Sequence, residues 1–176
     1  RKHISPKIKE WLRTRFPPRY EMFSMQNFHV YEVPRLNLQN PETSEYFLNV
    51  GEHWVRSAGT DGWRLDVAHG IPHAFWTEFR RRIKAVNPEA LLFGEVWGAG
   101  DKAEAREWVG PQAFDGIMNY WLWKAILEFF VYNTINAKAF ADKLGELRAN
   151  VPPQALHCMY NPLSTHDTPR ILSLAK

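Results

Sequence analysis

The sequence is poor in cysteine, and it contains no long run of charges of one sign. The single cysteine, Cys158, excludes a disulfide within the chain and a cysteine-rich zinc site. Cys158 stands among apolar residues, so we expect a small buried side chain there. The formal net charge of +3 is spread over residues of both signs. Without a basic block, neither a nucleic acid nor an anionic membrane is expected as a partner.

The start of the chain also lacks the signals of a natural N-terminus. Residues 1–3 include no initiator methionine, and no apolar run of the kind found in signal peptides follows them. At the other end, residues 171–176 break off where a helix is beginning. We therefore expect the 176 residues to be a piece of a longer polypeptide. The cytoplasm is the location we expect for it.

Aromatic residues, by contrast, are abundant. The chain has eight tryptophans, and 14% of its residues are Phe, Trp or Tyr. Sugar rings stack on flat apolar surfaces of this kind, although we expect about two-thirds of these side chains to lie in the core. The composition therefore allows carbohydrate binding without establishing it.

Strand and helix patterns alternate along the chain after an irregular stretch that ends near residue 40. Asn40 is expected to cap a helix that begins at Pro41 and stops at Gly59. Such alternation predicts an α/β fold with a parallel sheet and right-handed crossovers. The expected strands are 62–67, 90–95, 114–120 and 155–160. Further helices are expected over 72–87 and 102–109, and one long helix or two over 121–149.

Acidic residues end several of these strands. Residues 61–66 read Asp-Gly-Trp-Arg-Leu-Asp, residues 93–97 read Phe-Gly-Glu-Val-Trp, and residues 166–170 read His-Asp-Thr-Pro-Arg. A retaining glycosidase needs two carboxyl groups roughly 5–5.5 Å apart, and neighbouring strands are spaced ~4.8 Å. Asp66 and Glu95, at the ends of successive strands, are therefore expected to form such a pair.

In order and wording, these segments resemble the catalytic regions of the α-amylase family, glycoside hydrolase family 13. The resemblance is strongest to the branch of neopullulanases, cyclomaltodextrinases and maltogenic amylases, and it continues through residues 33–41 and 114–120. It implies a (β/α)₈ TIM barrel, which takes roughly 250 residues when complete, so this chain would hold about strands four to seven. Residues 1–40 would be the tail of the excursion between strands three and four, and 41–176 the partial barrel.

The resemblance implies a role for each acidic residue. Asp66 would be the nucleophile, Glu95 the acid/base, and Asp167 the group that binds sugar hydroxyls as the ring distorts. Arg64 would place a positive charge beside Asp66, and the apolar neighbours of Glu95 suit an acid. These roles imply a hydrolase that cleaves α-1,4 bonds in maltodextrins, cyclodextrins or pullulan by a retaining double displacement.

Further residues are expected to bind the substrate. They are Arg64, His166, Trp97, Tyr120 and His69, of which Trp97 and Tyr120 are the candidates for sugar stacking. Each assignment has a structural alternative. The Arg64–Asp66 contact could be a salt bridge only, Glu95 a helix cap or surface residue, the His166–Asp167 pair a cap for the next helix, and His69 an exposed loop residue.

Departures from the family pattern leave the specificity open. The nucleophile is followed by Ala68, His69 and Gly70, where many relatives read Ala-Asn-Glu, so the preference for hydrolysis over transglycosylation is undecided. Gly70 also replaces a calcium-ligating His of typical α-amylases. We expect no organic cofactor and no metal here, with any calcium bound outside this segment, and an α-glucan oligosaccharide as the ligand of a homodimeric parent enzyme.

Other functions stay open from the sequence. A family 13 transferase or isomerase, such as a branching enzyme or trehalose synthase, would use the same three acids. A non-catalytic relative would have lost them. An isolated half-barrel, with unpaired sheet edges, could be inert on its own.

Overall fold

The computed structural model describes residues 7, 23–24, 35–97 and 106–175. In the described part, a three-stranded parallel sheet lies between helices. None of the helices described combines the length and the hydrophobicity that a membrane span requires. The strands are β1 (Phe23–Ser24) and β2 (Arg35–Leu36), which form an antiparallel pair, and β3 (Gly62–Leu65), β4 (Leu91–Gly94) and β5 (Gly116–Ile117) of the parallel sheet. The helices are α2 (Pro41–Ala58), α3 (His73–Val86), α5 (Tyr120–Ile126), α6 (Ala137–Asn150), α7 (Pro153–His157) and α8 (Ile171–Leu174).

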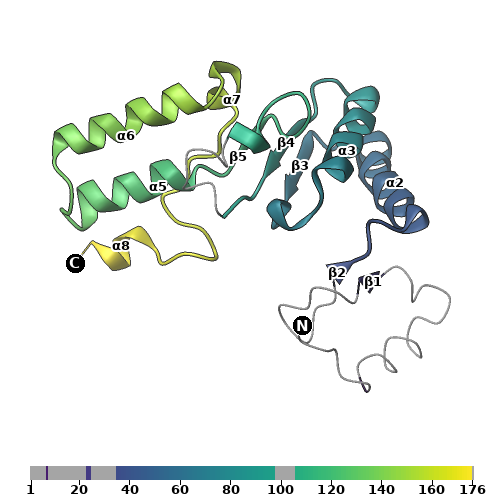
Figure 1. The fold of residues 1–176 in the computed structure, drawn as a ribbon, viewed down its shortest axis with the longest axis horizontal. Helices are drawn as coiled ribbons and strands as arrows, with labels where there is room; N and C mark the ends of the chain where they lie inside the picture. Colours follow the sequence, from purple (N-terminus) through teal and green to yellow (C-terminus); the bar gives the residue numbers. More distant parts are fainter. Residues whose placement is uncertain (1–6, 8–22, 25–34, 98–105, 176) are drawn as a thin grey trace.

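Helix α2 begins and ends as the sequence predicts. The Asn40 side chain accepts a hydrogen bond from the Thr43 backbone N–H at 2.9 Å, and Pro41 is the first helical residue. Gly59 ends the helix in the left-handed region, with φ 65°, which costs glycine nothing because it has no Cβ. Helices α2 and α3 pack together beside the sheet, whereas α5 and α6 form a hairpin that extends away from it (Figure 1).

The parallel sheet brings the ends of β3 and β4 to one level. Arg64 pairs with Phe93 and Leu65 with Gly94, so the residues that follow each strand stand opposite each other. β5 pairs with β4 on the other side. Beneath the sheet, the side chains of Leu92 and Ile117 are completely buried. The core therefore fixes the height at which the chain leaves each strand.

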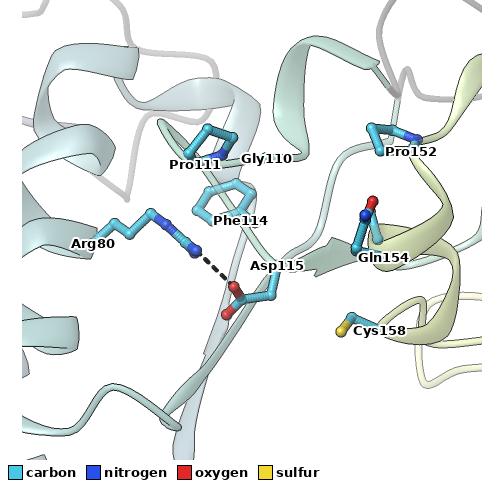
Figure 2. A pocket seen from close by; sticks show the side chains of 9 residues that line it. Arg80, Gly110, Pro111, Phe114, Asp115, Pro152, Gln154 and Cys158 are labelled. Atoms are coloured by element: carbon cyan, nitrogen blue, oxygen red, sulfur yellow. Dashed lines mark ion pairs between the residues drawn. The ribbon is translucent and has the colours of Figure 1, made fainter.

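Asp115 ties the first residues of the sheet to α3. Its carboxylate accepts the backbone N–H of Leu92 at 2.9 Å and forms ion pairs with Arg80 at 2.8 Å and Lys84 at 3.0 Å. Figure 2 shows the Arg80–Asp115 pair at the edge of a pocket of about 360 Å³, which Phe114 also lines. Burial alone would raise the pKa of Asp115, but the hydrogen bonds from Arg80, Leu92 and Lys84 outweigh it and lower that pKa.

The predicted strand over 155–160 is wrong in most of its length. Residues 153–157 form α7, and the chain pairs with the strand before it only at the bridge between Met118 and Tyr160. Pro153 occupies the first helical position, where its fixed φ favours a helix, and an apolar run this short fits either structure. Cys158, expected to be buried, is partly exposed.

One other boundary also differs from the predictions. The strand expected over 114–120 shortens to β5, and Tyr120 opens α5 with Asn119 as the N-cap. Residues 121–149, where one long helix or two were expected, hold most of α5 and α6, with a π-helical turn at Leu127–Val131 between them. Of the helix expected over 102–109, residues 106–108 are helical and 102–105 lie outside the described residues.

Candidate active site

Asp66 and Glu95 follow β3 and β4 at the same height. The Glu95 backbone N–H donates to the Leu65 carbonyl at 2.8 Å, and the Glu95 carbonyl accepts from Ala68 N–H at 2.9 Å. Asp66 is exposed, whereas Glu95 is only 1% exposed. The carboxyl ends of two adjacent parallel strands therefore present one accessible and one buried carboxyl group.

Arg64 connects these two carboxyl groups. Its Nη1 forms an ion pair with Asp66 Oδ1, as predicted, and its Nη2 lies 2.9 Å from Glu95 Oε1. The Arg64–Asp66 ion pair is expected whether its role is functional or purely structural, so it does not distinguish the two interpretations. The second contact, to Glu95, was not predicted, since nothing in the local sequence relates Arg64 to a residue on the next strand.

Glu95 is held by two further donors. Its Oε2 accepts the backbone N–H of Val67 at 3.0 Å, and its Oε1 lies 3.4 Å from the Tyr120 hydroxyl. The alternatives of a surface residue or a helix cap do not fit, because the side chain is buried and caps none of the described helices.

Val67 adopts a backbone conformation that is unusual for a β-branched residue. It lies in the left-handed region at φ 43° and ψ 45°, which costs about 1–3 kcal/mol where the surrounding structure enforces it. In this conformation the N–H groups of Val67 and Ala68 both reach Glu95, one at the side chain and one at the backbone. The turn after Asp66 thus fixes the position of Glu95.

Trp97 and Tyr120 stack on each other beside Glu95. Their ring centroids are 4.5 Å apart with an interplanar angle of 17°. Trp97 is 42% exposed, but Tyr120 only 5%. Trp97 therefore offers a ring to a ligand, while Tyr120 supports it from behind and is not itself an open platform. Burial, followed by the nearby charge of Glu95, raises the pKa of Tyr120 to about 12.

His166 and Asp167 lie in the segment after the chain passes β5. The two side chains are exposed and pair with each other, with His166 Nε2 at 3.0 Å from Asp167 Oδ2. Thr165 Oγ1 accepts the Asp167 backbone N–H at 3.1 Å. The alternative role as a helix cap is not found, because Arg170 occupies the N-cap of α8. The carboxylate of Asp167 is therefore free of that role.

A cleft of about 430 Å³ is lined by residues of β3 and β4 and by part of the segment with His166. Its lining includes Arg64, which contacts both carboxyl groups, together with Phe93, Tyr160, Thr165 and His166. The rings of Phe93 and Tyr160 stack at a centroid distance of 6.0 Å. Tyr160 was missed from the sequence, because its position depends on the parallel bridge to the β5 region.

Neither His69 nor a cluster of metal ligands adds to the cleft in the described residues. His69 is exposed in the 3-10 turn Ala68–Gly70, and it is not among the described residues that line the cleft. Within residues 35–97 and 106–175, no three His, Cys, Asp or Glu side chains gather as ligands for a metal ion.

The comparisons with known proteins bear on the same residues. The model for the catalytic domain of alpha amylase matches residues 18–176. The chain belongs to the α-amylase family. This confirms the resemblance noted in the sequence, whereas the division at residue 40 stays a prediction, because the match runs across it.

Relatives within the α-amylase family come from the expected branch. A cyclomaltodextrinase of a Bacillus species is 40% identical over 177 residues, covering 96% of this chain and 30% of the relative. Neopullulanase 2 of Thermoactinomyces vulgaris is 41% identical over 154 residues, covering 88% and 25%. A solved cyclomaltodextrinase matches with a TM-score of 0.82 and 36% identity over 94% of this chain and 30% of that one. The chain thus spans under a third of these relatives and has the fold of part of a TIM barrel domain.

Proposed function

We propose that this chain carries the catalytic carboxyl groups of an α-glucan hydrolase that cleaves α-1,4 bonds in maltodextrins, cyclodextrins or pullulan with retention. One observation carries the proposal: Asp66 and Glu95 stand at level ends of adjacent strands, and Arg64 bridges them. That arrangement suits the short carboxyl separation of retaining glycosidases. The names of the relatives, cyclomaltodextrinase and neopullulanase, support the substrate class.

In the first step, Asp66 attacks the anomeric carbon while Glu95 protonates the departing glycosidic oxygen. The exposure of Asp66 leaves it open to substrate, and Arg64 forms an ion pair with its carboxylate. A glycosyl ester forms on Asp66, and the C–O bond to the leaving sugar breaks. In the second step, Glu95 takes a proton from water, which displaces Asp66 and regenerates both groups.

The remaining residues bind the sugar. His166 lines the cleft and pairs with Asp167, so the two offer a ring N–H and a carboxylate to sugar hydroxyl groups, and Trp97 offers the exposed ring on which a sugar can stack. We place His69 on the acceptor side, where its exposure allows contact with a leaving or incoming sugar. We also propose that the reaction needs no organic cofactor and that any calcium binds outside this segment. The proposal also includes an α-glucan oligosaccharide as the substrate, a homodimeric parent enzyme and a location in the cytoplasm.

Sugar release from three glucans tests the proposal. The protein to use is the extended chain, meaning these residues together with the flanking segments of the gene that complete the barrel. We expect it to release reducing sugar from maltodextrin, β-cyclodextrin or pullulan, and the Asp66→Asn variant to retain less than about a hundredth of that rate. Asp61→Asn, the same change at the other end of β3, is the matched control and keeps its activity.

Two results would overturn the assignment. Full activity of Asp66→Asn would remove the nucleophile from the mechanism. Longer and shorter glucans formed without net release of reducing ends would assign the transferase reaction that uses the same acids.

A further inference from the structure

Three donors hold the Glu95 carboxyl group, and only one of them can reverse its role. Arg64 Nη2 and the Val67 N–H lie at 2.9 and 3.0 Å from its oxygens, and both can only donate a hydrogen bond. The Tyr120 hydroxyl, 3.4 Å from Oε1, can donate or accept. An acid/base residue alternates between a carboxylate and a carboxylic acid, so it needs a partner that suits both forms.

We propose that Tyr120 is a positioning residue for Glu95, with its hydroxyl donating to the carboxylate and accepting from the carboxylic acid. The inference rests on the proposed function, in which Glu95 changes its protonation state twice in each cycle. When Glu95 is ionised, Tyr120 joins the other two donors. When Glu95 carries the proton, the hydroxyl rotates to accept a hydrogen bond from it and holds the carboxyl group until the proton passes to the glycosidic oxygen, whereas a guanidinium can only donate.

The surroundings of Tyr120 fix its ring and place several hydrogen-bond partners around its hydroxyl. Tyr120 is the first residue of α5, directly after the N-cap Asn119. Trp97 covers one face of the ring, and Trp123 meets it edge-on at a centroid distance of 6.0 Å. Besides Glu95, the hydroxyl has the Thr165 side chain as a hydrogen-bond partner and a weak sulfur acceptor, Met118 Sδ, at 3.8 Å. A fixed ring with a rotating hydroxyl is the geometry that the proposed role requires.

Tyr120 also stays neutral throughout the range in which Glu95 works. Its burial removes the phenol from water, and the negative charges of Glu95 and Asp167 oppose a third negative charge, so its pKa rises to about 12. A neutral phenol keeps both its proton and its lone pairs. The negative charges of Glu95 and Asp167 therefore help to keep Tyr120 in the neutral form that can position Glu95.

Tyr120→Phe in the extended chain tests this role, because phenylalanine keeps the ring and deletes the hydroxyl. We expect kcat/KM for maltodextrin to fall about tenfold, equivalent to ~1.4 kcal/mol, while kcat/KM for α-maltosyl fluoride stays within about twofold. Departing fluoride needs no proton, so its loss does not depend on a well-placed acid. Tyr132→Phe, at an exposed tyrosine after the π-helical turn, is the matched control and changes neither value.

Several outcomes would overturn the inference. Equal losses on both substrates, or a variant that does not fold, would make the hydroxyl structural. A raised KM with unchanged kcat would make Tyr120 a sugar contact, and unchanged kinetics would remove any role. The Asp66→Asn variant, measured alongside, tests the proposed function separately. If Asp66→Asn is active, the proposed function is refuted. If Asp66→Asn is inactive and Tyr120→Phe is fully active, only this inference is refuted.

Discussion

Replacing Asp115 with alanine should destabilise the fold more than the loss of any exposed ion pair. The carboxylate joins β4, the strand that leads to Glu95, to the cations of α3 through Arg80 and Lys84. Removing one partner from a buried pair costs about 3–5 kcal/mol, because it leaves the other charge buried and unpaired. Here the side chains of Asp115, Arg80 and Lys84 keep 16%, 17% and 25% exposure. Water therefore relieves part of the penalty, and we expect a loss of about 2–3 kcal/mol.

Urea unfolding of the extended chain, followed by tryptophan fluorescence, measures this loss. Asp142→Ala is the matched control, since it breaks an ion pair with Lys138 on the surface of α6 and should cause no measurable change. A loss in Asp115→Ala as small as that of the control would refute the reasoning, because the carboxylate would then contribute no more than a surface charge.

The pH dependence of the same difference gives a second check on Asp115. Its pKa is lowered in the folded state, so its contribution is present above the unfolded pKa of about 3.9. The contribution is lost as the pH falls through the lowered folded value. The difference in unfolding free energy between wild type and Asp115→Ala should therefore be constant from pH 7 to about 5 and shrink below about 4. A difference that grew on acidification would contradict the ion-pair account.

Three further predictions concern the site and its support. Glu95→Gln should lower kcat/KM for maltodextrin by about 10²–10⁴ and that for maltosyl fluoride far less, and equal losses would make Glu95 structural. Gly116→Ala should destabilise the extended chain by about 1–3 kcal/mol in urea unfolding, because a Cβ would strike a backbone carbonyl after α7; an unchanged midpoint would contradict this close approach. Glu78 should titrate by carbon NMR near the value of about 2 to which hydrogen bonds from Arg81 and then Arg82 lower its pKa. The contribution of this network to stability is therefore complete above the usual pKa of ~4.3 and is lost as the pH falls from there through the folded value. A midpoint near ~4.3 would refute those contacts.

Local signals predicted the parts of the fold that depend on neighbours in sequence. The caps of α2 at Asn40 and Gly59 were predicted correctly because a side-chain acceptor and a residue without a Cβ are chemical requirements of a helix end. The level placement of Asp66 and Glu95 followed from parallel strands of similar length. The strand at 155–160 failed because its apolar run was too short to distinguish a strand from a helix, and Pro153 decided for the helix.

Contacts between distant segments could not be predicted. Nothing in the local sequence predicts a left-handed conformation at Val67, because β-branched residues rarely adopt it. In this conformation the Val67 N–H contacts Glu95, which lies 28 residues later in the chain. Tyr120 was expected to face a sugar as the end of a strand. Instead α5 begins at that residue, and its hydroxyl turns toward Glu95 while Trp97 covers the ring. Such roles depend on tertiary packing.

The most direct test of the central claim is to trap the glycosyl ester and identify the residue that carries it. The Glu95→Gln variant of the extended chain, given α-maltosyl fluoride, can lose fluoride to the nucleophile but lacks the base that returns water to the ester. We predict that mass spectrometry of the digested protein finds one maltosyl group on Asp66, and none when Asp66→Asn is added. A maltosyl group on another residue, or no ester together with a product of inverted anomeric configuration, would contradict the account.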